Sequence, residues 1–325
     1  MTAPTTQAAA TPTRPAYPRV LAQPPEPDHH PPSGGTRAGR APTLADVAEP
    51  RQHRLVARNT ATTSANKIHD DAVARRYGFA GGLVPGVDVY AALAHLPAAA
   101  WGLDWLARGT LSARFPAPVY EDDDVVVTAR PAGEGLTLEL RTGPGAAEGG
   151  GTLCATGEAH LPPPGAAAAA PATGEWADVA PAAEPPPASP ESLAPGTALA
   201  LAPHGFHAES AAAYLADVGE TLPLFTEQRV AHPGWLLRDA NHVLSSNVVL
   251  GPWIHVGSAT THHAVVADGA LVGARAIVAR EWERKGHRFV ELDVALLADG
   301  AVAARVAHTA IYRPRAADLA GGEHR

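Results

Sequence analysis

The sequence is poor in cysteine, in lysine and in long apolar runs. Cys154 is the only cysteine, which excludes an intramolecular disulfide and a cysteine cluster for structural zinc. No window approaches the roughly 20 consecutive apolar residues of a membrane-spanning helix. The first residues show no basic region followed by an apolar stretch, as a secretory signal would. We therefore expect a soluble protein of the reducing cytoplasm, with no membrane partner.

Positive charge is also scarce. Acidic residues outnumber Lys and Arg by 33 to 25, which gives a formal net charge of −8 and an isoelectric point near 6.0. This balance disfavours general binding to nucleic acid. Four histidines in the C-terminal part have no compact metal-ligand spacing, so we expect them on strand surfaces and predict no metal site: His262, His263, His287 and His308.

Proline and alanine are concentrated in two stretches without apolar periodicity. The first covers residues 1–48, which we predict to be a disordered tail because such a segment buries too little apolar surface to offset the entropy of ordering. The second covers residues 162–203 and is predicted to be a linker. Two patterned regions, 49–161 and 204–315, remain, followed by a short tail at 316–325. Each is long enough to form a domain with its own core.

The first patterned region predicts a short helix near Asp70 and then an apolar helix over 87–94 that Pro97 helps to end. Short segments of strand-forming residues surround these helices, mostly separated by Gly, Pro or Asp. Together they predict an antiparallel sheet with strands at 54–58, 110–115, 124–129, 136–141 and 152–160.

The second patterned region repeats this order of elements. The segment Val84-Pro85-Gly86-Val87 has a counterpart in His232-Pro233-Gly234-Trp235, which is again followed by a helical stretch, residues 236–244. Strands follow once more, with a hairpin turn at 284–287. The predicted strands cover 270–283, 288–297 and 301–312. We therefore predict a duplicated helix-on-sheet unit.

A histidine shortly before a glycine-started helix indicates a thioester site. A thioester carbonyl develops negative charge when it is attacked or when its α-carbon is deprotonated, and the free N–H groups of a helix N-terminus stabilise that charge. Gly86 would supply such a group, and His69 would act as the base. The competing interpretations are a structural role of His69 in capping the next turn and a tight turn at Gly86.

Three motifs in the first patterned region resemble those of one family. They are Asn66-x-x-His69-x-Asp71, Gly78-Phe79-x-Gly81, and Arg114-Phe115-x-x-Pro118-Val119-Tyr120. Over roughly residues 52–160 the sequence resembles MaoC-like acyl dehydratases and R-specific enoyl-CoA hydratases of the hotdog fold. The resemblance implies an α+β double hotdog, with two antiparallel sheets each wrapping a central helix and paired side by side. It also implies a substrate thioester of coenzyme A or acyl carrier protein, no cofactor of the enzyme's own, and a monomer or homodimer.

The resemblance implies hydro-lyase chemistry with catalytic His69 and Asn66, where Asn66 orients water or binds the substrate carbonyl. The family's aspartate five positions before this histidine is replaced by Ser64, which cannot act as a carboxylate base. The oxyanion and substrate-binding positions are then Gly86, Ser64, Pro85 and Asp70. Asp70 also suits the charge of a helix start.

Two other functions remain open. The second half offers a possible site at His232, Gly234, Asp239 and Asn241. Thioester hydrolysis centred on His232 and Asp239 is one alternative, and buried structural hydrogen bonds are the competing interpretation of these residues. The lost aspartate motivates the other alternative, a non-catalytic subunit that binds acyl thioesters.

Overall fold

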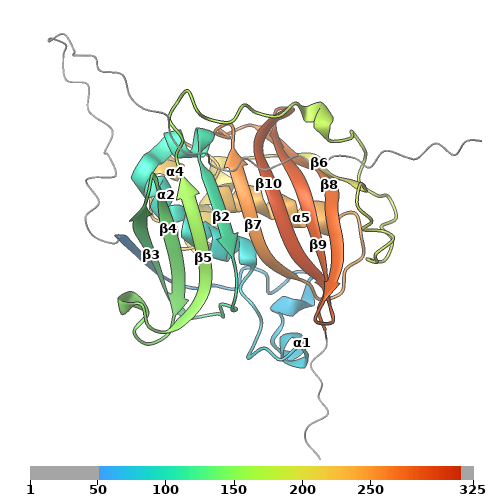
Figure 1. Ribbon diagram of the computed structural model, residues 1–325, viewed down its shortest axis with the longest axis horizontal. Coiled ribbons are helices and arrows are strands. Elements are labelled where there is room, and N and C mark those ends of the chain that lie inside the picture. The colour runs from blue at the N-terminus through green and yellow to red at the C-terminus, as the bar shows by residue number, and fades with distance from the viewer. Residues whose placement is uncertain (1–50, 316–325) are drawn as a thin grey trace, which may run out of the picture. The chain divides into compact units, whose positions relative to one another are not determined.

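Figure 1 shows the computed structural model, which describes residues 51–315; the tails predicted at 1–48 and 316–325 lie outside the described residues. The strands of the described part form one ten-stranded sheet in the order β1-β3-β4-β5-β2-β7-β10-β9-β8-β6, and every neighbouring pair is antiparallel. The first half has the strand order β1-β3-β4-β5-β2. The second half, read from its outer edge inward, has the order β6-β8-β9-β10-β7, which is the same order with each strand number raised by five. The predicted duplication is confirmed.

The strands divide evenly between the two halves. The first half contains β1 (Arg51–Val56), β2 (Thr110–Arg114), β3 (Asp124–Ala132), β4 (Gly135–Thr142) and β5 (Thr152–His160). The second half contains β6 (Ala198–Gly205), β7 (Ile254–His262), β8 (Leu271–Arg284), β9 (His287–Ala298) and β10 (Ala301–Arg313). The halves join edge to edge through β2 and β7, where Thr110 pairs with Thr261 and Arg114 with Gly257.

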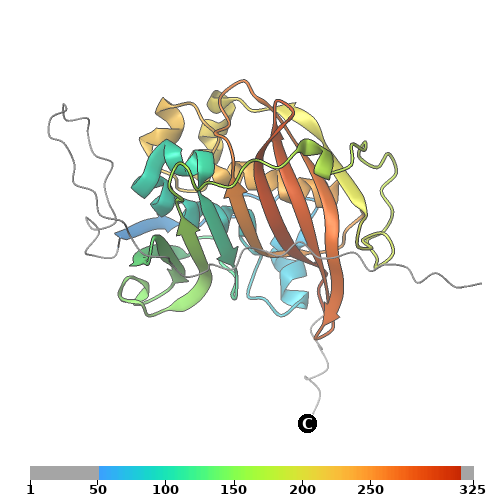
Figure 2. The same ribbon diagram turned by 45° about the horizontal axis from the view of Figure 1, so that its top comes forward.

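Two long helices pack on one face of this sheet (Figure 2). Helix α2 (Gly86–Arg108) packs on the first-half strands and on β7, and α5 (Pro233–Ser245) packs on β6, β8 and β9. The two helices also contact each other, so a single apolar core spans both halves. The shorter helices are η2 (Lys67–His69), α1 (Asp71–Arg76), η3 (Ala146–Glu148), η4 (Thr173–Glu175), α3 (Ala208–Asp217) and α4 (Pro223–Glu227). Within residues 51–315, none of the helices combines the length and apolarity needed to cross a membrane.

Helix α2 is much longer than predicted, because Pro97 does not end it. Pro97 lies buried inside the helix, which continues to Arg108 and departs from helical geometry only at Gly102, with φ 57° and ψ −142°. Proline in a helix interior costs roughly 3 kcal/mol. The buried residues that surround Pro97 on both sides offset this local cost, since tertiary packing provides most of the stability of a protein helix.

The segment predicted as a linker contains a strand and a docked side chain. β6 begins at Ala198, inside the predicted range 162–203, and pairs with β8. Earlier in the segment, the indole of Trp176 is 1% exposed, packs against Ala295 and Val302, and donates from Nε1 to the Asp293 carbonyl at 2.9 Å. The alternating Ala-Leu pattern of β6 is short and lies among prolines, which hid it from the sequence prediction.

Candidate active site between the two halves

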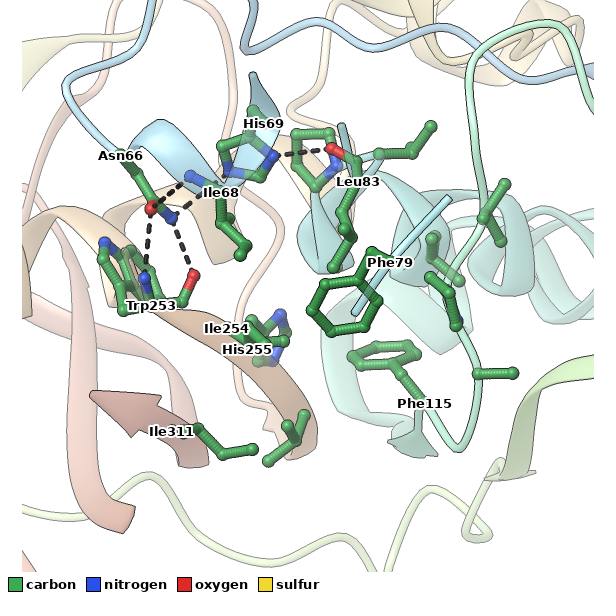
Figure 3. Close-up of a pocket in the computed structure, with 18 of the residues that line it drawn as sticks. Asn66, Ile68, His69, Phe79, Leu83, Phe115, Trp253, Ile254, His255 and Ile311 are labelled. Atoms are coloured by element: carbon green, nitrogen blue, oxygen red, sulfur yellow. Dashed lines mark hydrogen bonds between the residues drawn. The ribbon is translucent and has the colours of Figure 1, made fainter. Parts of the chain in front are cut away.

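A cavity of about 200 Å³ lies where the start of α2 meets β7 (Figure 3). Its walls combine the loop before α2, the segment after β2, the first residues of β7 and one residue of α5. Much of the lining is apolar and includes Phe79, Leu83, Phe115, Ile254 and Ile311. The polar side chains among the lining residues are those of Asn66, His69, Asn241 and His255. Such a mixture suits an apolar ligand with one reactive polar end.

His69 presents a neutral imidazole to this cavity. Its Nδ1 lies 2.6 Å from the carbonyl oxygen of Leu83 (Figure 3). Because a carbonyl only accepts hydrogen bonds, Nδ1 carries the ring proton and Nε2 keeps its lone pair. Burial lowers the pKa of His69 below 6.5, and the hydrogen bond to Leu83 offsets this effect only in part. The ring can therefore accept a proton at Nε2.

Asn66 holds the neighbouring parts of the site together. Its Oδ1 accepts from the backbone N–H of Ile68 at 3.3 Å and of Trp253 at 3.1 Å. Its Nδ2 donates to the Trp253 carbonyl at 2.9 Å and lies 3.3 Å from His69 Nε2. Both amide hydrogens and both lone pairs of the oxygen are thus engaged. In this structure Asn66 therefore has a positioning role, and its contact with water or substrate stays a prediction.

The start of α2 supplies hydrogen-bond donors. Pro85 is its N-cap and makes no side-chain capping bond, and the N–H groups of Gly86 and Val87 have no acceptor within residues 51–315. A Cβ on Gly86 would lie 2.8 Å from Nδ1 of His255, so only glycine fits without a shift. The open helix N-terminus therefore faces the cavity beside a side chain from β7.

Two of the predicted pocket residues do not line the cavity. Ser64 accepts from the backbone N–H of Asn66 at 3.1 Å, which supports the loop that carries the asparagine. Asp70 caps α1 by accepting from the Val73 N–H at 3.0 Å. The predicted helix-start role of Asp70 is confirmed. Pro85 and Gly86 do line the cavity, as predicted.

The equivalent start of α5 is closed. His232 caps this helix, because its Nδ1 accepts from the Gly234 N–H at 3.0 Å. The proton on its Nε2 then faces Glu220 at 3.2 Å, and the other oxygen of Glu220 lies 2.8 Å from His95 Nδ1. A Cβ on Gly234 would lie 2.5 Å from the Tyr214 hydroxyl oxygen. A side chain thus caps the Gly234 N–H, whereas the Gly86 N–H has no acceptor within residues 51–315.

Glu220 is a buried carboxylate within this closed cluster. Burial acts to raise its pKa, but the hydrogen bonds and charges of His232 and His95 together hold the pKa well below its usual range. The carboxylate is therefore ionised and paired on both sides. Glu220 lies in the loop between α3 and α4, so the cluster ties this loop to α2 through His95 and to the start of α5 through His232. The Gly234 N–H is unavailable to a substrate because His232 accepts its hydrogen bond.

Asp239 and His232, predicted as a hydrolytic pair, belong to different clusters. Asp239 is 3% exposed and contacts Nε2 of His204 at 3.0 Å and Nδ1 of His242 at 3.4 Å. Burial acts to raise the pKa of Asp239, yet the hydrogen bonds from these two histidines lower it below its usual value. Asn241, two residues further along α5, lines the first cavity, and its Oδ1 has no partner in the described part of the chain.

The prediction from the sequence did not include His255. This residue lies on β7, a strand for which no pattern was recognised, so the direction of its side chain was not predictable. His262 and His308 were expected on strand surfaces, and this was wrong: they are 4% and 0% exposed. Both point to the helix-covered face of the sheet. Within residues 51–315, no group of three or more His, Cys, Asp or Glu side chains is arranged to hold a metal ion.

Comparison with known proteins connects this chain to one fold. No protein-family model matches the sequence, and no curated protein sequence matches it. A structure described as a MaoC-like dehydratase superposes with a TM-score of 0.53 at 14% identity, over 82% of this chain and 98% of that chain. A putative MaoC domain protein dehydratase from Chloroflexus aurantiacus gives 0.55 at 11% identity, over 86% and 100% of the two chains. A conserved hypothetical protein from Mycobacterium tuberculosis, described as having a double hotdog fold, gives 0.52 at 13% identity, over 83% and 98%. The chain has the double hotdog fold, as predicted.

Proposed function

We propose that the protein is a hydro-lyase of the hydratase or dehydratase type, and that the cavity beside Gly86 binds an acyl thioester of coenzyme A or acyl carrier protein. One observation carries the proposal: a neutral His69 with its lone pair at Nε2 and the unpaired N–H groups at the start of α2 meet at one largely apolar cavity. A base and an oxyanion donor at one acyl-sized space are the groups that this reaction needs.

In hydration of a 2-enoyl thioester, Nε2 of His69 takes a proton from water while the water oxygen forms a bond to C3. The C2=C3 electrons move toward the thioester carbonyl, whose oxygen becomes an enolate oxygen next to the Gly86 N–H. The imidazolium then returns the proton to C2, which regenerates the neutral ring. The long 3.3 Å contact from Asn66 is the one that water replaces at Nε2. Dehydration follows the same path in reverse.

The size of the cavity favours a short acyl chain. At about 200 Å³ it is smaller than the roughly 300–1,000 Å³ of common small-molecule pockets. Phe79 and Phe115 line this volume, and their aromatic rings lie next to each other (Figure 3). A four-carbon enoyl group is therefore the first substrate to test.

The test is hydration of crotonyl-CoA, which is measured as the loss of the absorbance of its enoyl thioester. We expect turnover by the wild-type protein, a decrease of roughly 10²- to 10⁴-fold in His69→Ala, and lower activity with longer enoyl chains. His204→Gln is the matched control, because His204 is 41% exposed and pairs with Asp239 outside the cavity. Undiminished turnover in His69→Ala would refute the assignment.

The two alternatives give different results in the same samples. Release of free coenzyme A from saturated acyl-CoA would favour hydrolysis. Thermal stabilisation by acyl-CoA without turnover of either substrate would favour a binding subunit.

A further inference from the structure

A buried chain of hydrogen bonds leads from the cavity into the second half. His255 Nε2 lies 2.8 Å from the Ser258 hydroxyl, and this hydroxyl lies 2.9 Å from His308 Nδ1. The three residues are 6%, 4% and 0% exposed, and the two imidazole rings stack with centroids 4.3 Å apart. The chemistry proposed for His69 uses none of these groups.

The two ring nitrogens at the ends of this hydrogen-bond chain are His255 Nδ1 and His308 Nε2. Neither has a hydrogen-bond partner within residues 51–315. They differ in what surrounds them. His255 lines the cavity, and its Nδ1 is the atom that a Cβ on Gly86 would meet. It therefore lies beside the unpaired N–H groups at the start of α2, whereas His308 is enclosed by the core.

The single hydroxyl proton of Ser258 determines where the ring protons are. The hydroxyl donates to one ring and accepts from the other, so two arrangements exist. In the first, an unpaired N–H lies at His255 Nδ1, at the edge of the cavity. In the second, it lies at His308 Nε2, where no ligand reaches it. Both nitrogens are buried and without an acceptor in the described residues, but a ligand oxygen in the cavity can supply an acceptor only at His255 Nδ1, so ligand binding favours the first arrangement.

We propose that His255 donates its Nδ1–H to the thioester oxygen beside the Gly86 N–H, and that Ser258 and His308 act as positioning residues that hold this tautomer. The inference rests on the proposed function for the placement of the thioester. The oxyanion site then has one hydrogen-bond donor from α2 in the first half and one from β7 in the second half.

The environment keeps His255 a neutral donor. Burial, followed by the nearby His308, lowers the pKa of His255 well below 6.5, and burial lowers the pKa of His308 to about 3. A neutral imidazole donates a hydrogen bond to a developing enolate without bringing in an uncompensated charge. Removal of one oxyanion donor typically lowers kcat by roughly 10²- to 10³-fold.

The test is the carbonyl stretching frequency of butyryl-CoA labelled with ¹³C at its carbonyl, recorded by infrared difference spectroscopy. This saturated probe cannot be hydrated, so the band reports polarisation without turnover. We expect a lower frequency on the wild-type protein than in solution, and a return toward the solution value in His255→Leu. His255→Asn keeps an N–H near the position of Nδ1 and should retain the low frequency, as should His69→Ala.

Ser258→Ala provides a second variant with little change in volume. It should give a band between those of the wild type and His255→Leu, because the tautomer is no longer held. A band that stays at the wild-type frequency in both His255→Leu and Ser258→Ala would overturn the inference, even if crotonyl-CoA is hydrated. A shift that depends on His255 in a protein without hydratase activity would support the inference and refute the proposed reaction.

Discussion

The side-chain amide of Asn66 pairs with the backbone of Trp253 in the same way as one strand residue pairs with another. Its oxygen accepts from the Trp253 N–H at 3.1 Å, and its nitrogen donates to the Trp253 carbonyl at 2.9 Å (Figure 3). Trp253 directly precedes β7, and His255 is the second residue of that strand. The pair therefore ties the loop that carries His69 to the strand that carries the proposed second donor.

Replacing Asn66 should weaken both stability and activity. In Asn66→Ala the N–H and carbonyl of Trp253 lose their partners, which should lower the free energy of unfolding by roughly 1–3 kcal/mol. The kcat/KM for crotonyl-CoA should fall as well, because His69 and Trp253 are no longer held together. Urea unfolding and initial rates measure the two effects. Asn66→Asp should not restore stability, because a carboxylate oxygen would then face the Trp253 carbonyl; a fully stable Asn66→Asp would contradict this account.

The two equivalent glycines should respond differently to alanine. In Gly86→Ala the new Cβ would lie 2.8 Å from His255 Nδ1, which should displace that ring and lower kcat/KM. In Gly234→Ala it would lie 2.5 Å from Ala91 Cβ, which should cost roughly 1–3 kcal/mol in stability. The folded fraction of Gly234→Ala should keep nearly wild-type kcat/KM. Loss of activity in Gly234→Ala alone, with Gly86→Ala fully active, would place the site in the other half.

The pH profile of kcat/KM should have its acid limb below pH 6.5. His69 acts as a base only when it is neutral, so activity falls as the pH drops through its pKa. Burial lowers that pKa from 6.5, which moves the loss of activity toward lower pH. Rates with subsaturating crotonyl-CoA measure the limb. An acid limb at or above pH 6.5 would mean that another group carries the proton.

Acid should destabilise the fold through the buried His262. Burial, followed by the neighbouring charge of His263, lowers the pKa of His262 to about 4, whereas the unfolded chain binds a proton at this residue near 6.5. Because the unfolded state binds the proton first, stability falls from pH 6.5 down to about pH 4 and then levels off for this residue. Between pH 8 and pH 5 the loss should be about 2 kcal/mol smaller in His262→Gln than in the wild type. Equal losses by urea unfolding would show that His262 is not buried in its neutral form.

Some elements were predictable because local patterns and long-range packing agree. The strand at 152–160 lies between a run of glycines and a run of prolines that mark its ends, and the structure has β5 over the same residues. The turn at 284–287 was predicted from its composition, and its central residues Lys285 and Gly286 have φ of 53° and 77°, as a tight hairpin requires. Where packing overrides propensity, as at Pro97, the prediction was wrong.

Only the residues that the first half contributes to the candidate site were predictable from the sequence. His69 and Gly86 lie close in the sequence, and the meaning of a histidine before a helix start follows from that spacing. The position of His255 depends on the pairing of β2 with β7, which brings together segments more than 140 residues apart, such as Thr110 and Thr261. No local pattern contains this information. The same holds for the separation of His232 from Asp239, since Glu220 and His204 are the residues that partner them.

The most direct measurement is a crystal structure of the protein with bound butyryl-CoA. The account predicts that the thioester oxygen lies within about 3 Å of the Gly86 backbone nitrogen, with the acyl chain between Phe79 and Phe115 and with His69 Nε2 facing the acyl carbons. A thioester bound at the start of α5, beside Gly234, or outside the cavity altogether would contradict it.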